Sequence, residues 1–300
     1  MSASAYNKKV RSFPYSLKDI CLPILLAAEA KQMQNKNTNK HDLIYGAIIG
    51  DYFGSNYEFS SRVEDKSKSL DITFEKGTYT DDTVMSVAVA DALLGKEDVA
   101  STLRKYGRSY PCPQGGYGGR FQAWLFDENM GPYGSFGNGA GMRVSPVAYF
   151  ASSEEECIRL SDEVTEITHN AKEGLKGARV VSLCVYKALH GASKEELREF
   201  IEPNYKVDFD LEELHQNYGM DETCQGSVPE ALFCFLSSDS FEDCLRRVCY
   251  IGGDADTIGA MACAIASAYY KEIPAKLLSI VKRDLPKGFK DVLDKIPANF

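Results

Sequence analysis

The sequence predicts an all-α fold, built as one compact bundle of many helices. Apolar residues recur every three or four positions along most of the chain after residue 43, which is the spacing of a buried helix face. Alternating apolar and polar residues, the pattern of half-buried strands, are scarce. There is no regular succession of strands and helices, and no GxGxxG motif follows a strand, so a parallel sheet is not expected.

Seven segments carry the helical spacing most clearly. In order along the chain, they are 43–53, 84–94, 173–189, 229–236, 241–248, 257–270 and 274–281. The segment 257–270 is rich in Ala, Gly and Ser, whose small side chains allow another helix to approach closely. We therefore expect this segment to be a central, tightly packed helix.

The domain organisation follows from composition along the chain. With 300 residues, 44% of them hydrophobic, the chain has enough apolar material for a substantial core. We expect residues 43–300 to form one domain and residues 1–42 to be an N-terminal extension, because 31–40 is polar and typical of a linker. The apolar run 20–28 weakly resembles a signal peptide, but Asp19 and Pro23 disfavour export.

Charge and cysteine content exclude several classes of protein. The net charge is -9 and no long Lys/Arg run occurs, so we expect no binding to nucleic acid and none to membranes. No apolar run is long enough to span a bilayer. The nine cysteines include no CxxC pair, which favours buried, reduced thiols in a cytoplasmic protein.

Two short acidic motifs point to chemistry. The first contains Thr80, Asp81 and Asp82, and the second contains Asp254, Asp256 and Thr257. Each has the features of a helix start, and small or apolar residues follow each in place of Lys or Arg. Ordinary helix capping explains either motif alone. Four carboxylates that converge without cations, however, require protonation or bound metal, and an all-oxygen ligand set with charge -4 favours two Mg²⁺, Mn²⁺ or Ca²⁺ ions.

Two further features belong to the same hypothesis. Asp51 lies in an apolar helical stretch, where an ionised side chain is costly unless it is paired or liganded, and Glu58 follows shortly after as a candidate acid/base or metal-shell residue. The segments 115–120 and 131–141 are dense in glycine. Glycine lets the backbone approach a ligand and direct N–H groups at it, although simple turns between helices are the alternative.

Taken together, these stretches resemble the ADP-ribosylglycohydrolases, the ADP-ribosyl-acceptor hydrolases that include the dinitrogenase-reductase-activating enzymes. The matching stretches, in chain order, are Gly46 to Glu58, Tyr79 to Thr83, Gly116 to Gly118, Ser135 to Pro146, Thr168 to Asn170, Cys224 to Pro229 and Gly252 to Thr257. The order of these seven matches, more than any one of them, carries the resemblance.

The resemblance implies an orthogonal all-α bundle with a catalytic domain over 43–300 and a centre of two Mg²⁺ or Mn²⁺ ions. Thr80, Asp81 and Asp82 would ligate the ions from one side, and Asp254, Asp256 and Thr257 from the other. Glu58, Asp82 and Asp256 are the expected catalytic residues. The expected substrate-binding residues are Asp51, Gly116, Tyr117, Gly118, Ser135, Phe136, Gly137, Asn138, Gly139 and His169, with Phe136 or Tyr117 available to stack on the adenine or ribose.

The function expected from this resemblance is hydrolysis of the bond between ADP-ribose and an acceptor, with release of free ADP-ribose. Arginine is the favoured acceptor; serine, a nucleobase or a small O-linked ester are alternatives. A non-catalytic ADP-ribose-binding relative and a metal-dependent hydrolase of nucleotide or sugar phosphates also remain open. We expect an ADP-ribosylated protein or small molecule as partner, and a monomer or weak homodimer.

Overall fold

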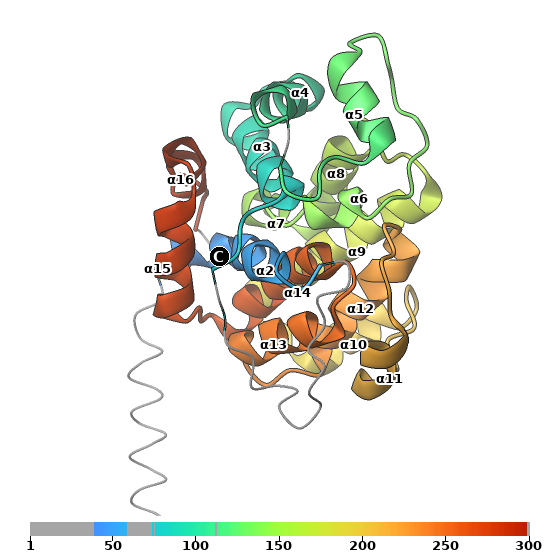
Figure 1. Ribbon diagram of the computed structural model, residues 1–300, viewed down its shortest axis with the longest axis vertical. Helices are drawn as coiled ribbons and strands as arrows, with labels where there is room; N and C mark the ends of the chain where they lie inside the picture. The colour runs from blue at the N-terminus through green and yellow to red at the C-terminus, as the bar shows by residue number, and fades with distance from the viewer. Residues whose placement is uncertain (1–38, 59–73, 75, 112, 299–300) are drawn as a thin grey trace, which may run out of the picture. The chain divides into compact units, whose positions relative to one another are not determined.

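The computed structural model describes residues 39–58, 74, 76–111 and 113–298. Helices dominate these residues, and the only strand-like pairings among them are two isolated bridges, Thr80 with Gln114 and Gly137 with Thr223. The helices (Figure 1) are η2 Lys40–Ile44, α2 Tyr45–Gly54, α3 Asp81–Gly95, α4 Val99–Ser109, α5 Gly119–Phe126, α6 Gly139–Met142, α7 Val147–Phe150, α8 Glu154–Thr165, α9 Lys172–Leu189, α10 Lys194–Ile201, α11 Leu211–Asn217, α12 Cys224–Leu236, α13 Phe241–Ile251, α14 Ala255–Tyr270, α15 Ala275–Asp284 and α16 Lys287–Leu293. The predicted all-α class is confirmed.

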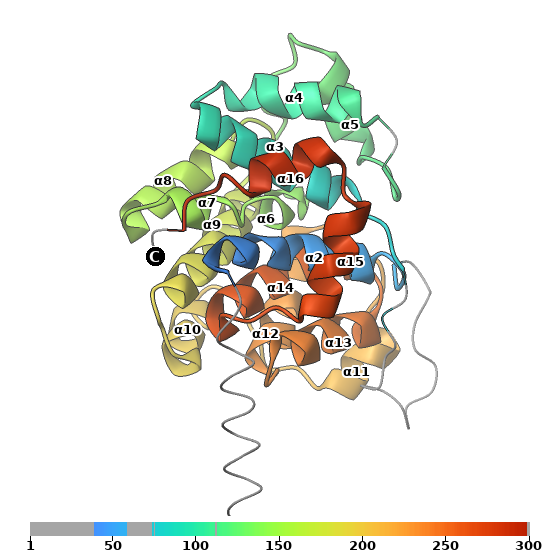
Figure 2. The ribbon, with the colours of Figure 1, turned by 90° about the vertical axis from the view of Figure 1, so that its left-hand side faces the viewer.

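The helices α2 and α14 form the centre of this body. Figures 1 and 2 both show them side by side, with α3, α4 and α5 on one side of the pair and α11, α12 and α13 on the other. Every residue of α14 from 255 to 268 is buried, as expected for a helix that is apolar on all faces.

Glycine at the crossing of α2 and α14 sets how closely the two helices approach. A Cβ added to Gly50 would lie 2.0 Å from the carbonyl oxygen of Gly259, and one added to Gly54 would lie 2.3 Å from that of Ala255. Only glycine fits such a backbone-to-backbone contact. The C-terminal end of α2 is therefore held against the N-terminal end of α14.

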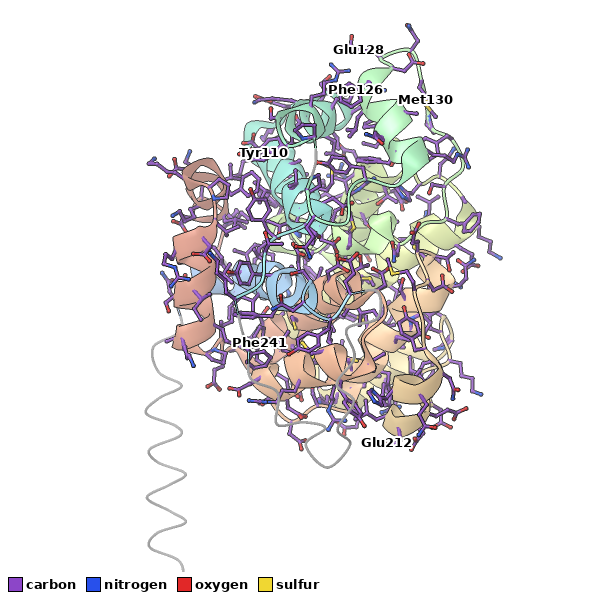
Figure 3. The ribbon with its side chains drawn as sticks, viewed as in Figure 1. Tyr110, Phe126, Glu128, Met130, Glu212 and Phe241 are labelled. Carbon is purple, nitrogen blue, oxygen red and sulfur yellow. The ribbon has the colours of Figure 1, made fainter. Side chains whose placement is uncertain are left out.

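Several outer helices begin with a side-chain cap. The side chains of Asp98, Ser153, Ser193, Asp210 and Ser240 each accept a hydrogen bond from a backbone N–H in the first turn of α4, α8, α10, α11 and α13 respectively. Figure 3 shows Phe126, Glu128 and Met130 at the outer end of α5 and the loop after it, far from Glu212 on α11.

The N-terminal boundary lies a few residues earlier than the expected position after residue 42. Residues 1–38, most of the expected extension, lie outside the described residues. Residues 39–42 are part of the body, because the His41 ring contacts the Ile296 carbonyl oxygen at 3.0 Å and Lys282 lies 2.5 Å from the Asp42 carboxylate.

Two expectations from composition can be compared with the described residues. None of their helices combines the length and apolar character needed to cross a bilayer. Their seven cysteines are all free and buried, as expected, while Cys21 and Cys112 lie outside the described residues.

Candidate active site

The C-terminal end of α2 and the N-terminal ends of α3 and α14 lie close together, and hydrogen bonds to Asp51 hold α2 and α3 in contact. Asp51 is fully buried on α2. Its carboxylate accepts hydrogen bonds from the Thr80 N–H at 3.0 Å, the Thr80 hydroxyl at 2.8 Å and the Thr83 N–H at 3.1 Å, and also from the Thr83 hydroxyl. These bonds fix the start of α3, and hence Asp82, against the centre of the bundle.

A cavity of about 490 Å³ opens beside these helix ends. One end of its lining is acidic and consists of Glu58, Asp81, Asp82, Asp254, Asp256 and Thr257. The other walls come from the glycine-rich segments and from His169, together with Arg120, Phe121, Tyr133, Met142, Arg143, Met220 and Glu222. The two acidic motifs, more than 170 positions apart in the chain, thus face one space, and the Thr257 hydroxyl lies 3.3 Å from the Asp82 carboxylate.

The carboxylates at the acidic end strongly disfavour one another's ionisation. Burial, and then the charge of Asp256, raise the pKa of Asp81 and of Asp82 well above the ordinary value. The same two causes raise the pKa of Asp254, and burial also raises the pKa of Asp256. Burial and the charges of Asp256 and Asp51 raise the pKa of Glu58 to about 8.

The donor set fits hard divalent cations. One oxygen each of Glu58, Asp82 and Asp256 is buried without a hydrogen-bond partner. Among the described residues, none of the acidic-end carboxylates pairs with Lys or Arg. In the same part of the chain, no group of three or more His, Cys, Asp or Glu side chains is already positioned to hold a metal ion. The unpartnered carboxylate oxygens, together with the Thr257 hydroxyl oxygen, are of the ligand type that Mg²⁺ and Mn²⁺ prefer.

The segment 135–139 forms the wall next to Asp254. The Asn138 amide donates to the Asp254 carboxylate, and the Asn138 N–H donates to the Glu222 carbonyl oxygen at 2.8 Å. The bridge between Gly137 and Thr223 holds the same loop against the start of α12. Ser135, Gly137, Asn138 and Gly139 all line the cavity, whereas the Phe136 ring is 47% exposed and lies outside the lining.

The segment 115–119 forms the wall next to Glu58. Gly115 and Gly116 both have a φ of +79°, a conformation that favours glycine. A Cβ on Gly115 would lie 3.1 Å from Glu58 Oε1, so glycine also makes room for that carboxyl group. Tyr117 lines the cavity, is buried against Phe121, and donates its hydroxyl to the Tyr110 carbonyl oxygen at 2.8 Å.

The cavity lining also contains a buried cation, Arg143, and a histidine, His169. Arg143 is 1% exposed and donates to the Thr168 hydroxyl oxygen at 2.8 Å and to the Val164 carbonyl oxygen at 3.2 Å. Burial lowers the pKa of Arg143 only to about 10, so it stays charged at neutral pH. Burial, and then the charge of Arg143, hold the pKa of His169 well below its ordinary value, so His169 is neutral.

Most of the residues expected at the site meet in this one cavity. Asp51, Thr80 and Phe136 lie outside its lining: Asp51 and Thr80 are fully buried and hydrogen-bonded to each other, and Phe136 is exposed. The roles assigned to individual residues stay predictions. Arg143 is a lining residue outside the predicted set, although a cation between the apolar positions Met142 and Val144 is a signal of a buried functional charge. Tyr133 and Met220 carry no such signal.

Comparisons with known proteins identify the class. The sequence model of the family described as ADP-ribosylglycohydrolase matches residues 38–299, and this chain belongs to that family. ADP-ribosylhydrolase ARH3 of Homo sapiens is 28% identical over 75% of this chain and 83% of its own length. ADP-ribosyl-[dinitrogen reductase] glycohydrolase of Rhodospirillum rubrum is 26% identical over 86% of this chain and 96% of its own. ADP-ribosylarginine hydrolase Tri1 of Pseudomonas putida (strain GB-1) is 27% identical over 76% and 69% respectively.

A solved structure supports the same fold. The structure titled ADP-ribosylglycohydrolase-related protein complex superposes with a TM-score of 0.65, covering 85% of this chain and 95% of that one, at 23% identity. The resemblance inferred from the seven motif stretches is confirmed, and with it the prediction that this chain is an ADP-ribosylglycohydrolase.

Proposed function

We propose that this protein uses two divalent cations, Mg²⁺ or Mn²⁺, to hydrolyse the glycosidic bond between ADP-ribose and an acceptor side chain, with arginine as the first choice. The observation that carries the proposal is the meeting of both acidic motifs in one cavity whose lining also contains Arg143 and the glycine-rich segments. Thr80, Asp81 and Asp82 would hold the ions from α3, and Asp254, Asp256 and Thr257 from α14. When bound, such ions lower the pKa of water and orient sugar hydroxyls.

Glu58 supplies the proton in this proposal. A general acid works best when its pKa lies near the working pH, and Glu58 meets this condition because its pKa is raised to about 8. The bond from the anomeric carbon to the acceptor atom breaks as that atom takes the Glu58 proton. Water then adds its oxygen to the oxocarbenium-like carbon, and its released proton returns to Glu58.

The other walls would hold the rest of the substrate. Backbone N–H groups of the glycine-rich segments are suited to the diphosphate, and the buried charge of Arg143 adds a favourable potential for an anion. The neutral His169 ring offers one N–H donor without adding a second charge. A cavity lined by both a carboxylate cluster and the buried Arg143 suits a ligand that carries both sugar hydroxyls and phosphates.

The acceptor is proposed from relatives alone. The Tri1 relative is named for ADP-ribosylarginine, which favours arginine. ADP-ribosylserine, an ADP-ribosylated nucleobase and small O-linked esters are the alternatives.

The test is a product assay on defined substrates. ADP-ribosylarginine and ADP-ribosylserine peptides are incubated with the full chain in Mg²⁺ or Mn²⁺, and free ADP-ribose is separated by chromatography. We expect release from the arginine substrate, and its loss in Asp82→Asn and Asp256→Asn. Asp291→Asn, on the exposed face of α16, is the matched control and should keep full activity. Binding of ADP-ribose without release from any substrate would favour a non-catalytic binding protein, and a phosphate or nucleotide product would favour a phosphohydrolase.

A further inference from the structure

Three buried side chains, two of which line the cavity, form a directional hydrogen-bond chain. Arg143 donates to the Thr168 hydroxyl oxygen at 2.8 Å, and that hydroxyl lies 2.7 Å from Nδ1 of His169. All three side chains are at most 5% exposed, so water does not compete for these bonds.

The donor capacity of each group fixes the direction of the chain. A guanidinium has donors only, so the Thr168 oxygen must accept from Arg143. Among the described residues, the Thr168 hydroxyl hydrogen has no acceptor within reach other than His169 Nδ1. Leaving it unused would strand a buried donor, which costs about 1–3 kcal/mol. The hydroxyl therefore donates to Nδ1, and Nδ1 carries no hydrogen.

We propose that Arg143 and Thr168 are positioning residues that lock His169 in the Nε2–H tautomer, so that its ring presents a hydrogen-bond donor to an oxygen atom of the ligand. In a neutral imidazole one nitrogen carries the hydrogen, so an accepting Nδ1 requires a donating Nε2. His169 then recognises hydroxyl or phosphate oxygen and does not act as a base.

The position of Nε2 agrees with this role. A Cβ on Gly139 would lie 3.0 Å from His169 Nε2, and a Cβ on Gly137 would lie 3.5 Å from it. Both glycines line the cavity, as does His169. The absence of side chains at these two positions leaves the Nε2 edge of the ring open toward a bound ligand.

The tautomer can be measured without any ligand, so its outcome is independent of the proposed function. The full chain has four histidines, 41, 169, 190 and 215, and ¹⁵N-histidine labelling with long-range ¹H–¹⁵N correlation spectra distinguishes the two tautomers. Comparison with His169→Gln assigns the His169 signals. We expect Nε2–H in the wild-type protein. An Nδ1–H ring in the wild type would overturn the proposal.

Variants test the two positioning residues. Thr168→Val removes the hydroxyl and Arg143→Met removes its donor, and we expect both to raise the Nδ1–H fraction, whereas Thr168→Ser should keep the wild-type tautomer. Thr165→Val is the matched control, because Thr165 is equally buried and its hydroxyl has no hydrogen-bond partner. An unchanged tautomer in both Thr168→Val and Arg143→Met would overturn the proposal, whatever their ligand affinity.

Affinity for free ADP-ribose gives the functional readout, and this part rests on the proposed function. Loss of one aligned donor should raise the Kd about tenfold in Thr168→Val, with no change in Thr165→Val or Thr168→Ser. Failure of the wild type to bind ADP-ribose would count against the proposed function, while the spectra would still decide the tautomer. Unchanged affinity in a Thr168→Val protein with an altered tautomer would contradict the role of His169 as a ligand donor.

Discussion

Glu58 and Asp51 are both carboxylic acids near the end of α2, but they differ in their hydrogen-bond partners and in their position relative to the cavity. Asp51 is fully buried and accepts four hydrogen bonds from Thr80 and Thr83, so it fastens the start of α3. Glu58 lines the cavity and has one oxygen without a partner. The Asp51 carboxylate therefore holds the start of α3 in place, whereas the unpartnered Glu58 oxygen agrees with the proposed proton transfer.

At the scale of this residue, Glu58→Gln should lower the turnover rate by roughly 10²–10⁴-fold, the usual contribution of a general acid, and change the Kd for ADP-ribose only slightly. Because Glu58 must be protonated to act, the wild-type rate should fall as pH rises through the pKa of Glu58. Bound cations would offset part of the negative charge that raises this pKa, so the midpoint of the fall should lie at or below about pH 8. Glu58→Gln should lose this alkaline limb. Turnover measured from pH 5.5 to 9.5 checks both points, and an unchanged profile in Glu58→Gln would assign the proton to another group.

The sequence was informative for single residues where a charge interrupts an apolar segment. Asp51 was selected for that reason, and it is indeed fully buried and hydrogen-bonded. Its partners could not be read from the sequence, because residues 80 and 83 reach it only through the packing of α3 on α2. The expectation that Phe136 stacks on the ligand depends on its motif position. The Phe136 side chain is 47% exposed and lies outside the cavity lining, and its contact with a ligand stays a prediction.

At the scale of elements, the contact of α2 with α14 positions the site, and Gly50→Ala tests it. The added methyl group would lie 2.0 Å from the Gly259 carbonyl oxygen, so the helices must separate. We expect a loss of about 1–3 kcal/mol in the free energy of unfolding, measured by urea titration, together with lost turnover. Gly288→Ala in α16 is the control, because its added methyl group meets nothing within 4 Å and should stabilise by up to about 1 kcal/mol. Equal stability of both variants would contradict the role of this crossing.

The sequence predicts helices best where apolar residues are dense. The expected segment 257–270 corresponds to α14, Ala255–Tyr270, and 173–189 to α9, Lys172–Leu189. The short outer helices such as α4, Val99–Ser109, and α10, Lys194–Ile201, are not among the predicted segments, because they contain few apolar residues. The start of α12 was placed at Pro229, but Thr223 caps it and the helix continues through the proline.

At the scale of the whole molecule, the acidic end makes stability depend on pH. The folded-state pKa of Asp51 is raised to about 7 and that of Glu58 to about 8, from ordinary values of 3.8 and 4.5. The folded protein therefore binds more protons than the unfolded chain between these limits, and the free energy of unfolding falls as pH rises from about 4 to about 8.

We accordingly expect the melting temperature in EDTA to be lower at pH 8 than at pH 5.5. Mg²⁺ or Mn²⁺ should restore it at pH 8, because cations that bind only the folded state stabilise it by mass action. Asp256→Asn should reduce both the pH slope and the response to cations, whereas Asp291→Asn should leave them as in the wild type. No change in the melting temperature at pH 8 on addition of millimolar Mn²⁺ would contradict the proposed metal centre.

The central claim is that Asp82 and Asp256, brought together from two distant motifs, share bound cations that the hydrolysis requires. The most direct test counts Mn²⁺ bound to the full chain at equilibrium and follows the release of ADP-ribose as the ions are added back to chelated protein. We predict two ions per chain, activity that returns in parallel with their binding, and loss of both in Asp82→Asn and Asp256→Asn. Full activity in protein that has been stripped of divalent ions would contradict the claim.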